Sequence, residues 1–288
     1  MDNEISSALL EFAGRRLGKE FISASPVSGG DINKAFCLHT SQEKLFLKWN
    51  VGNRFPAMFQ KEANGLAALA KNGIRTPEVI DVNSFGSHQY LILQWVETGK
   101  RAPGFWNDLG TMLAELHGRP QDFYGWPEDN YIGSLVQQNR KMCSWPSFYG
   151  ECRIMPLVAM LRDNGSFDRK TVAQAETFCK RLNAVFPSEP PSLLHGDLWA
   201  GNFMIDHSGN PLLIDPAVYF GHREMDIGMS LLFGGFDEEF YQAYQLAYPL
   251  EKGWEQRLDF TQLYPLLVHG VLFGGHYVST CRSFFEAF

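Results

Sequence analysis

The stretch that decides the fold lies at residues 193–216 and reads LLHGDLWAGNFMIDHSGNPLLIDP. It begins as a short apolar strand and passes through a polar loop that carries Asp197 and Asn202. Residues 203–214 then predict a β-hairpin, because two apolar segments flank a Ser-Gly-Asn sequence typical of a turn. Asp215 follows the second strand. We therefore expect Asp197, Asn202 and Asp215 on the loops at one end of a hairpin.

These three residue types suit metal-dependent phosphoryl transfer. A carboxylate such as Asp197 can orient a hydroxyl group and accept its proton. The side-chain oxygens of Asn202 and Asp215 are hard ligands of the kind that Mg²⁺ prefers. Protein kinases carry an Asp, an Asn and a second Asp in the same order along the chain. The stretch therefore predicts a kinase that uses Mg²⁺, with ATP as the expected phosphate donor.

A second pattern upstream is typical of nucleotide binding. Lys48 lies near the end of an alternating strand, and Glu62 lies in a helix predicted over residues 56–72. An ion pair between them would hold the ammonium group toward nucleotide phosphates. Gly29 and Gly30 lie between two strand-like segments, where a backbone without Cβ atoms can approach phosphates closely. Taken alone, these residues also fit a simple hairpin and a solvated surface pair.

The rest of the chain predicts an α+β fold with two lobes. A small lobe rich in β-strands is expected at residues 1–97, and a larger, mainly helical lobe at residues 98–288. An aromatic and polar loop is expected at residues 123–132. The expected helices span residues 3–17, 56–72, 103–117, 145–162, 168–186, 237–247 and about 255–282.

Composition narrows the functional classes. The chain has 288 residues and a formal net charge of −7, which argues against nucleic acid as a partner. The sequence shows neither a signal peptide nor an apolar run of transmembrane length, so we expect a cytoplasmic protein without a membrane partner. The five cysteines are scattered and lack the spacing of a zinc site, which predicts free thiols. Oligomeric state is not predicted.

Two strings carry a resemblance to a known family. HGDLWAGN at residues 195–202 and IDPAVYFGHREMDIGMSLLFGGF at residues 214–236 closely resemble the fructosamine kinase (ketosamine kinase) family. This family is similar to aminoglycoside phosphotransferases and belongs to the protein-kinase-like superfamily. The resemblance extends from about residue 28 to residue 277. It implies a two-lobe protein-kinase-like fold and a Gly-Gly lid in place of the usual kinase glycine pattern.

The resemblance also implies an activity. It predicts ATP-dependent phosphorylation of a sugar hydroxyl, expected to be the 3-hydroxyl, on a fructosamine or ribulosamine. The acceptor would be a free ketosamine or a glycated lysine on a protein, and the implied purpose is deglycation repair. Asp226 would hydrogen-bond the loop that carries Asp197. Which ketosamine sugar is the substrate stays open.

Binding residues follow from the same resemblance. In kinase-like folds the backbone after the last strand of the small lobe binds the adenine edge. The candidates here are Gln94, Trp95, Val96 and Glu97. For the acceptor, the family carries a tryptophan where this chain has Trp199. Packing is at least as good an explanation for the other acceptor candidates, which are Trp126, Tyr131 and His269.

Two alternatives remain at this point. A related small-molecule kinase acting on an aminoglycoside or an amino alcohol would use the same catalytic residues with a different acceptor pocket. A non-catalytic pseudokinase could keep the fold and bind nucleotide alone. Loss of Lys48, Asp197 or a metal ligand would indicate a pseudokinase, and the sequence retains all of them.

Overall fold

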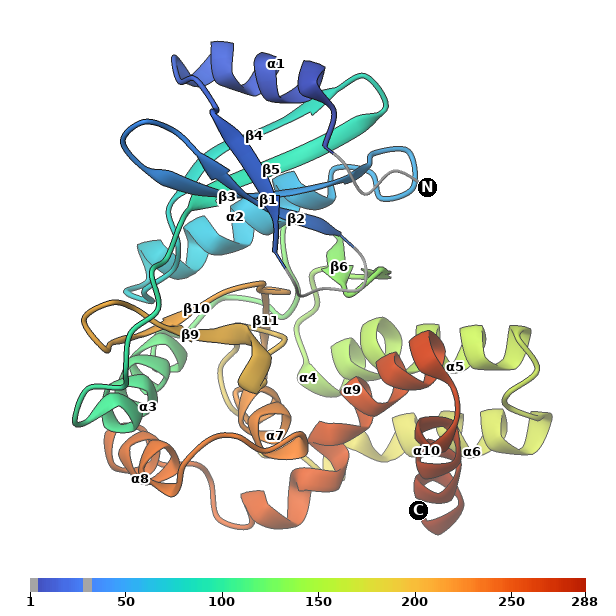
Figure 1. Ribbon diagram of the computed structural model, residues 1–288. Helices are drawn as coiled ribbons and strands as arrows, with labels where there is room; N and C mark the ends of the chain where they lie inside the picture. Colours follow the sequence, from blue (N-terminus) through green and yellow to red (C-terminus); the bar gives the residue numbers. More distant parts are fainter. Residues whose placement is uncertain (1–4, 28–32) are drawn as a thin grey trace. The chain divides into compact units, whose positions relative to one another are not determined.

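A computed structural model describes residues 5–27 and 33–288. The chain forms two compact units. The first comprises Met1–Ala102 and Met204–Asp215, and the second comprises Pro103–Phe203 and Pro216–Phe288. The first unit is built on a sheet and the second is mainly helical, as the α+β prediction requires (Figure 1). Gly29 and Gly30 lie outside the described residues.

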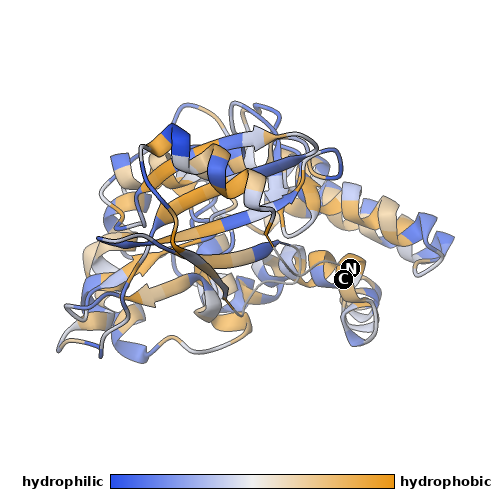
Figure 2. Cartoon of the chain, turned by 45° about the horizontal axis from the view of Figure 1, so that its top comes forward, coloured by the Kyte–Doolittle hydropathy of each residue, from blue (hydrophilic) through white to orange (hydrophobic). Residues whose placement is uncertain are grey.

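An antiparallel five-stranded sheet forms the centre of the first unit. Its strands lie in the order β1-β2-β3-β5-β4. Successive side chains of each strand face opposite sides of the sheet. The strands of this sheet are largely orange, and so hydrophobic, in Figure 2. The elements are α1 (Ser7–Leu17), β1 (Ser23–Pro26), β2 (Lys34–His39), β3 (Lys44–Val51), α2 (Met58–Lys71), β4 (Val79–Phe85) and β5 (His88–Gln94).

Each face of this sheet is covered by one helix, as Figure 1 shows. Strand β5 illustrates the division, since Tyr90 and Ile92 pack in the cluster with α1. Leu91 and Leu93 pack in the cluster with α2, which contributes Phe59. Burial of both faces explains why β5 is apolar at every one of these positions. The two helices therefore fix the sheet that carries Lys48.

The hairpin predicted at residues 203–214 is present, as β9 (Phe203–Ile205) and β10 (Pro211–Leu213). Backbone hydrogen bonds attach it to the first unit, from Leu213 N to Arg75 O at 2.8 Å and from Gly99 N to Ile205 O at 3.3 Å. A Cβ atom on Gly99 would lie 2.5 Å from the carbonyl oxygen of Asp206, so only glycine permits this approach.

The attachment changes the expected division of the chain. Residues 98–288 were expected in one lobe, but residues 204–215 and the segment up to Ala102 belong to the first unit. The physical reason is the backbone pairing of the hairpin with residues 75 and 99. Asp215, at the end of this hairpin, is therefore part of the unit that contains Lys48.

The second unit is helical, with short two-stranded pairings. Its large core includes the fully buried rings of Phe148, Tyr149 and Phe178. Its helices are α3 (Phe105–His117), α4 (Trp145–Phe148), α5 (Met155–Asp163), α6 (Arg169–Arg181), α7 (Glu224–Leu232), α8 (Glu238–Ala247), α9 (Leu258–Phe273) and α10 (His276–Ala287), with π-helix Tyr149–Ile154 and 3₁₀ turns Leu182–Ala184, Ala200–Asn202 and Trp254–Arg257. Its strands are β6 (Asn130–Ile132), β7 (Leu135–Gln137), β8 (Ser192–Leu194) and β11 (Tyr219–Gly221).

Three features of this unit differ from the sequence-based expectation. The loop expected at residues 123–132 ends in a strand, because β6 pairs with β7 in a hairpin. The helix expected at residues 145–162 contains the π-helical segment between α4 and α5. The C-terminal helix is interrupted at Gly274 and Gly275, since both adopt positive φ angles of 69° and 60°.

Two further sequence-based expectations concern the whole chain. All five cysteines are free, as predicted. No helix in the described ranges is both long enough and apolar enough to span a bilayer.

Candidate active site

The first unit brings together a lysine and two carboxylates. Lys48 lies on β3, and its Nζ donates to Glu62 Oε1 on α2 at 2.8 Å. The same ammonium group donates to Asp215 Oδ1 at the end of the hairpin. The predicted Lys48–Glu62 ion pair is therefore present. The contact of Lys48 with Asp215 was not predicted, because the sequence did not show that the hairpin packs on this sheet.

Burial strengthens the charge interactions within this cluster and shifts the pKa values of its members. Burial lowers the pKa of Lys48, but attraction to Glu62 and Asp215 outweighs that effect and raises the pKa above its ordinary value. Burial raises the pKa of Glu62, and the charge of Asp215 adds to that increase against the opposing effect of Lys48. Lys48 thus stays protonated, with its charge balanced by two carboxylates. Such a cluster can exchange one carboxylate contact for a phosphate.

Asp215 has an unusual backbone conformation with a positive φ angle. Its φ angle is 54°, in the left-handed region that few residues other than glycine adopt, with Asn, Asp and His the most frequent among them. Its side chain is 43% exposed, whereas the side chains of Lys48 and Glu62 are 10% and 12% exposed. Asp215 therefore presents a carboxylate to solvent at the end of a turn that the hairpin holds in place.

The second unit carries the loop at residues 195–202, called the HGD loop below. Asn202 Nδ2 donates to the carboxylate oxygen Oδ2 of Asp197 and to the backbone oxygen of Asp197, both at 2.8 Å. This bidentate contact fixes the orientation of the Asp197 carboxylate. Because the amide nitrogen of Asn202 is engaged, its side-chain oxygen is the atom suited to bind a cation.

A buried carboxylate supports the HGD loop. Asp226, on α7, accepts hydrogen bonds from the backbone nitrogens of His195 at 2.7 Å and Gly196 at 2.9 Å. His117 Nε2 lies 3.3 Å from the same carboxylate, and its Nδ1 lies 2.8 Å from the hydroxyl of Tyr244. Since a carboxylate only accepts hydrogen bonds, His117 donates to it from Nε2. The contact expected from Asp226 is present.

Gly196 is required by the close approach of two backbone segments. Its φ angle is 81°, and a Cβ atom there would lie 2.1 Å from the backbone oxygen of Ala217. The backbone nitrogen of Ala217 donates to the oxygen of His195 at 2.9 Å. The HGD loop is thus bonded to the segment that follows Pro216, and any larger residue at 196 would separate them.

We predict that Asp226→Asn destabilises the second unit in a pH-dependent way. Burial raises the pKa of Asp226, but hydrogen bonding and charge interaction with His117 and the loop amides lower it overall. The stabilisation is therefore present above about pH 4 and is lost as pH falls through the lower native pKa. The variant should lose about 3 kcal/mol at pH 7 in urea unfolding.

The control for this prediction is Asp163→Asn, whose side chain is exposed and paired with Arg162 on the surface. That substitution should change the free energy of unfolding by no more than about 0.5 kcal/mol. A loss of stability in Asp226→Asn that is as large at pH 3 as at pH 7 would contradict an ionised Asp226.

The structure places the four acceptor candidates in two settings. Trp199 is 39% exposed, and its ring lies 6.3 Å from that of Phe233. Phe233 in turn lies 4.8 Å from the ring of His269, so these three form a continuous aromatic row that begins in the HGD loop. Trp126 packs on Phe220 at 4.9 Å. The row therefore connects Trp199 with His269 through Phe233.

His269 and Tyr131 differ in environment. Burial lowers the pKa of His269, whose Nδ1 lies 2.8 Å from the backbone oxygen of Pro265. A neutral His269 is thus favoured, and its ring serves packing more than charge. Tyr131 lies opposite Val136 in the β6–β7 hairpin, where burial raises the pKa of its hydroxyl.

The segment expected to bind adenine follows β5. The backbone nitrogen of Gln94 donates to Glu78 O at 2.9 Å, so this amide is already used within the sheet. Outside the strand ladder, no turn or loop hydrogen bond engages the backbone of residues 95–97 in the described part of the chain. The side chain of Glu97 pairs with Lys44 at 2.7 Å. Trp95, Val96 and Glu97 therefore keep backbone groups suited to a ligand.

Sequence reasoning missed the residues that support the site. His117, the last residue of α3, bonds the carboxylate that holds the HGD loop. Its partner Tyr244 lies on α8 and was given no role. The only signal in the sequence was a polar aromatic residue at the end of an otherwise apolar helix stripe. Such a signal does not identify a partner, because the partner lies far along the chain.

The fold is shared with known phosphotransferases. A spectinomycin phosphotransferase, solved with ADP and spectinomycin, superposes with a TM-score of 0.62 at 14% identity, covering 99% of this chain and 95% of that one. At this identity the likeness shows the fold alone. A candidate fructosamine-3-kinase from Thermobifida fusca superposes with a TM-score of 0.87 at 29% identity, covering 100% and 99% of the two chains.

The chain belongs to the fructosamine kinase family, whose family model matches residues 1–288. A probable ketoamine kinase of Enterococcus faecium is 38% identical over 265 residues, which is 91% of this chain and 94% of that protein. The chloroplastic protein-ribulosamine 3-kinase of Arabidopsis thaliana is 37% identical over 270 residues, which is 90% of this chain and 80% of that protein.

Proposed function

We propose that this chain transfers a phosphoryl group from ATP to a sugar hydroxyl of a ketosamine, with the 3-hydroxyl of a fructosamine or ribulosamine as the expected acceptor. The observation that carries the proposal is the full-length match to the fructosamine kinase family. The acceptor is a free ketosamine or a glycated lysine on a protein. Phosphorylation makes the adduct labile, so the role is deglycation repair, and we expect it in the cytoplasm.

Asp197 is the proposed catalytic base. Its carboxylate would orient the acceptor hydroxyl and take its proton as the phosphate bond forms. The amide of Asn202 donates to one carboxylate oxygen, Oδ2, and so orients the carboxylate. Most of the rate enhancement in such a site comes from positioning and charge neutralisation, so this fixed orientation matters as much as basicity.

Lys48 is the proposed phosphate ligand. Glu62 holds its ammonium group, and burial of the pair prevents the lysine from turning to solvent. Gly29 and Gly30 would cover the phosphates from a lid, a role that falls on residues outside the described part of the chain. The adenine edge would bind the backbone of Trp95, Val96 and Glu97, with Gln94 at the end of the strand.

Asn202 and Asp215 are the proposed Mg²⁺ ligands. Their chemistry fits the ion, since an amide oxygen and a partly exposed carboxylate are hard oxygen donors. No cluster of three or more His, Cys, Asp or Glu side chains suited to a metal occurs among the described residues. A Mg²⁺ ion bound with substrate phosphates needs only one or two protein carboxylates. When bound, the ion would neutralise charge on the phosphates.

The acceptor would lie against Trp199, whose indole face suits the C–H face of a sugar. His269 extends the same aromatic row, and Tyr131 and Trp126 are further candidates. A related kinase acting on an aminoglycoside or an amino alcohol would share the catalytic residues and differ in this acceptor surface.

A substrate panel tests the proposal. Turnover of ATP is measured with ribulose-lysine, fructose-lysine, kanamycin and choline under identical conditions. We expect turnover with one or both ketosamines and background rates with kanamycin and choline. Turnover of kanamycin or choline without turnover of a ketosamine would contradict the proposed substrate class.

A further inference from the structure

The second unit contains a fully buried arginine that the proposed chemistry does not use. Arg153 has no solvent exposure and lies in the π-helical segment Tyr149–Ile154. No acidic side chain forms an ion pair with it in the part of the chain that the structure describes. A buried cation without a carboxylate is costly unless dipoles and aromatic faces surround it. The groups that surround Arg153 must therefore stabilise its charge.

Aromatic rings and oxygen dipoles stabilise the Arg153 charge. The guanidinium carbon lies 4.0 Å from the ring centroid of Tyr219, 4.5 Å from that of Phe148 and 5.4 Å from that of Tyr264. Its Nη1 donates to the backbone oxygens of Gln138 and Cys152, and its Nη2 donates at 2.7 Å to Oδ1 of Asn139. Its buried Nε has no hydrogen-bond partner among the described residues. The bond to Asn139 orients the amide of that residue, because it commits the amide oxygen and leaves the nitrogen to donate onward.

A chain of buried amides continues from Asn139. Its Nδ2 donates to Asn130 Oδ1 at 2.9 Å, and Asn130 Nδ2 donates to the backbone oxygen of Val218 at 2.8 Å. Gln137 Nε2 donates to the backbone oxygen of Ala217 at 3.0 Å and to Asn130 Oδ1 at 2.8 Å. The donors of the β6–β7 hairpin thus hold two consecutive carbonyl groups directly after Pro216.

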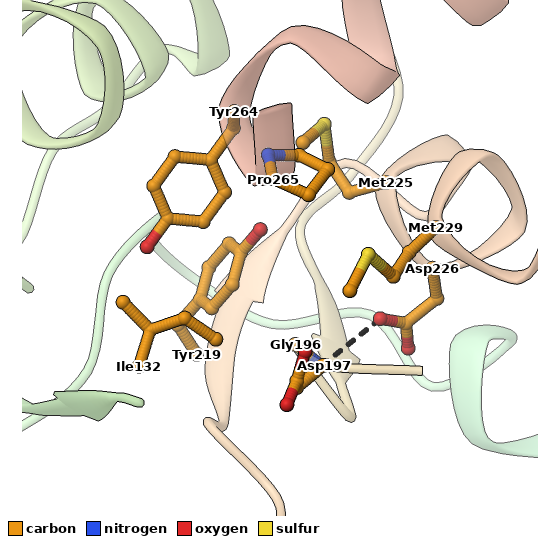
Figure 3. Close-up of a pocket in the computed structure, with 9 residues that line it drawn as sticks. All are labelled: Ile132, Gly196, Asp197, Tyr219, Met225, Asp226, Met229, Tyr264 and Pro265. Carbon is orange, nitrogen blue, oxygen red and sulfur yellow. Dashed lines mark hydrogen bonds between the residues drawn. The ribbon is translucent and has the colours of Figure 1, made fainter. Parts of the chain in front are cut away.

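Tyr264 completes this amide network, which is formed by Asn130, Gln137, Asn139, Arg153 and Tyr264. Its hydroxyl donates to Gln137 Oε1 at 2.7 Å, which fixes the orientation of the Gln137 amide. Tyr264 and Tyr219 also line a cavity of about 20 Å³ with Asp197 and Asp226, as Figure 3 shows. The network therefore begins at the buried charge and ends beside the proposed base.

The network is connected to the HGD loop through one backbone hydrogen bond. Ala217 N donates to His195 O at 2.9 Å, while Ala217 O accepts from Gln137. Both polar groups of this peptide segment are thus used, one toward the loop and one toward the network. A displacement of residues 217–218 would shift the loop that carries Asp197.

We propose that Gln137 and Tyr264, oriented from Arg153 through the two asparagines, are positioning residues for phosphoryl transfer. They hold the backbone of residues 217–218 and, through it, the HGD loop in the geometry that aligns Asp197 with the acceptor. This inference rests on the proposed kinase function. It adds a second support to the loop. Asp226 binds the backbone nitrogens of His195 and Gly196, and Ala217 binds the backbone oxygen of His195.

The role requires the whole network and not one bond. Each amide has its oxygen and its nitrogen committed, so removal of one partner leaves a buried polar group unsatisfied. The amide left without its partner would form a new hydrogen bond within the network and so reorient the neighbouring side chain. Small displacements of a catalytic group reduce rate strongly, by up to about 100-fold per ångström. A conservative substitution should therefore affect turnover more than binding.

The test compares two conservative substitutions of buried tyrosines. Tyr264→Phe removes only the hydroxyl that donates to Gln137. Tyr149→Phe is the matched control, because its hydroxyl donates to the backbone oxygen of Phe260, outside the network. We expect Tyr264→Phe to lower kcat about tenfold with an unchanged KM for ATP. Tyr149→Phe should leave both constants near the wild-type values.

A second measurement does not depend on activity. Hydrogen–deuterium exchange should rise in peptides covering residues 193–199 and 216–221 of Tyr264→Phe, and it should stay unchanged there in Tyr149→Phe. Gln137→Leu should reproduce the Tyr264→Phe result in both measurements. If the panel showed no kinase activity but exchange rose as described, the proposed function would be wrong and the support of the loop would stand. Equal effects of the two tyrosine substitutions, or none, would overturn the inference.

Discussion

Asp197→Asn is expected to lower kcat about 1,000-fold, within the range that general acid–base catalysis contributes. Asparagine has the same shape but cannot accept the proton of the acceptor hydroxyl. The contact from Asn202 uses a side-chain oxygen and a backbone oxygen, and Asn at 197 retains both. The loop should therefore keep its geometry. Coupled-assay turnover with the preferred ketosamine gives the rate.

Nucleotide binding should survive the same substitution. The Lys48–Glu62 pair lies in the other unit. The dissociation constant for ATP, measured by calorimetry, should therefore change by less than about threefold. A tenfold change would correspond to about 1.4 kcal/mol. Near-full turnover of Asp197→Asn would show that another group takes the proton. Loss of nucleotide binding would instead show that Asp197 has a structural or metal-binding role.

Asp215→Asn is expected to have the opposite pattern, with loss of Mg²⁺-dependent nucleotide binding. Removing one charged ligand should weaken Mg·ATP binding by at least about 100-fold, since even indirect partners of a metal typically contribute 10- to 100-fold. The fold should tolerate the change. Asparagine accepts a φ angle of 54° more readily than most residues, and the side chain is 43% exposed.

The hydrogen bond between Lys48 and Asp215 allows a second measurement on the same variant. The Asp215 charge contributes to the raised pKa of Glu62, so its removal should lower the pKa of Glu62 while Lys48 keeps one partner. Binding of ATP without Mg²⁺ should therefore change little in Asp215→Asn. Equal losses with and without Mg²⁺ would indicate that Asp215 acts through Lys48 and not through a metal.

The sequence predicted the parts of the site that lie close together along the chain. Asp197 and Asn202 were expected on the loops at one end of the hairpin, and in the structure they lie in one loop and contact each other. Lys48 and Glu62 were expected to pair because a lysine on a strand and a glutamate on the following helix form such a pair in kinases, and the structure contains it. The α+β fold followed from the same local patterns, since periodicity distinguishes the strands of the first unit from the helices of the second.

The sequence did not predict contacts that depend on distant segments. The hairpin after Asn202 was assigned to the larger lobe, because nothing in residues 204–215 indicates that Gly99 admits a close backbone approach. The amide network was missed for a related reason. Asn130 is an ordinary polar residue in a segment read as a loop, and Gln137 lies outside every predicted element. Their carbonyl partners at residues 217–218 lie far along the chain.

The most direct test of the central claim is the mass of the product. Ribulose-lysine or fructose-lysine is incubated with ATP, Mg²⁺ and either wild-type protein or Asp197→Asn, and the adduct is analysed by mass spectrometry. The account predicts that the wild type adds one phosphate to the sugar and that the variant adds little over the same period. An adduct that stays unmodified with the wild type, or that is phosphorylated equally by both proteins, would contradict it.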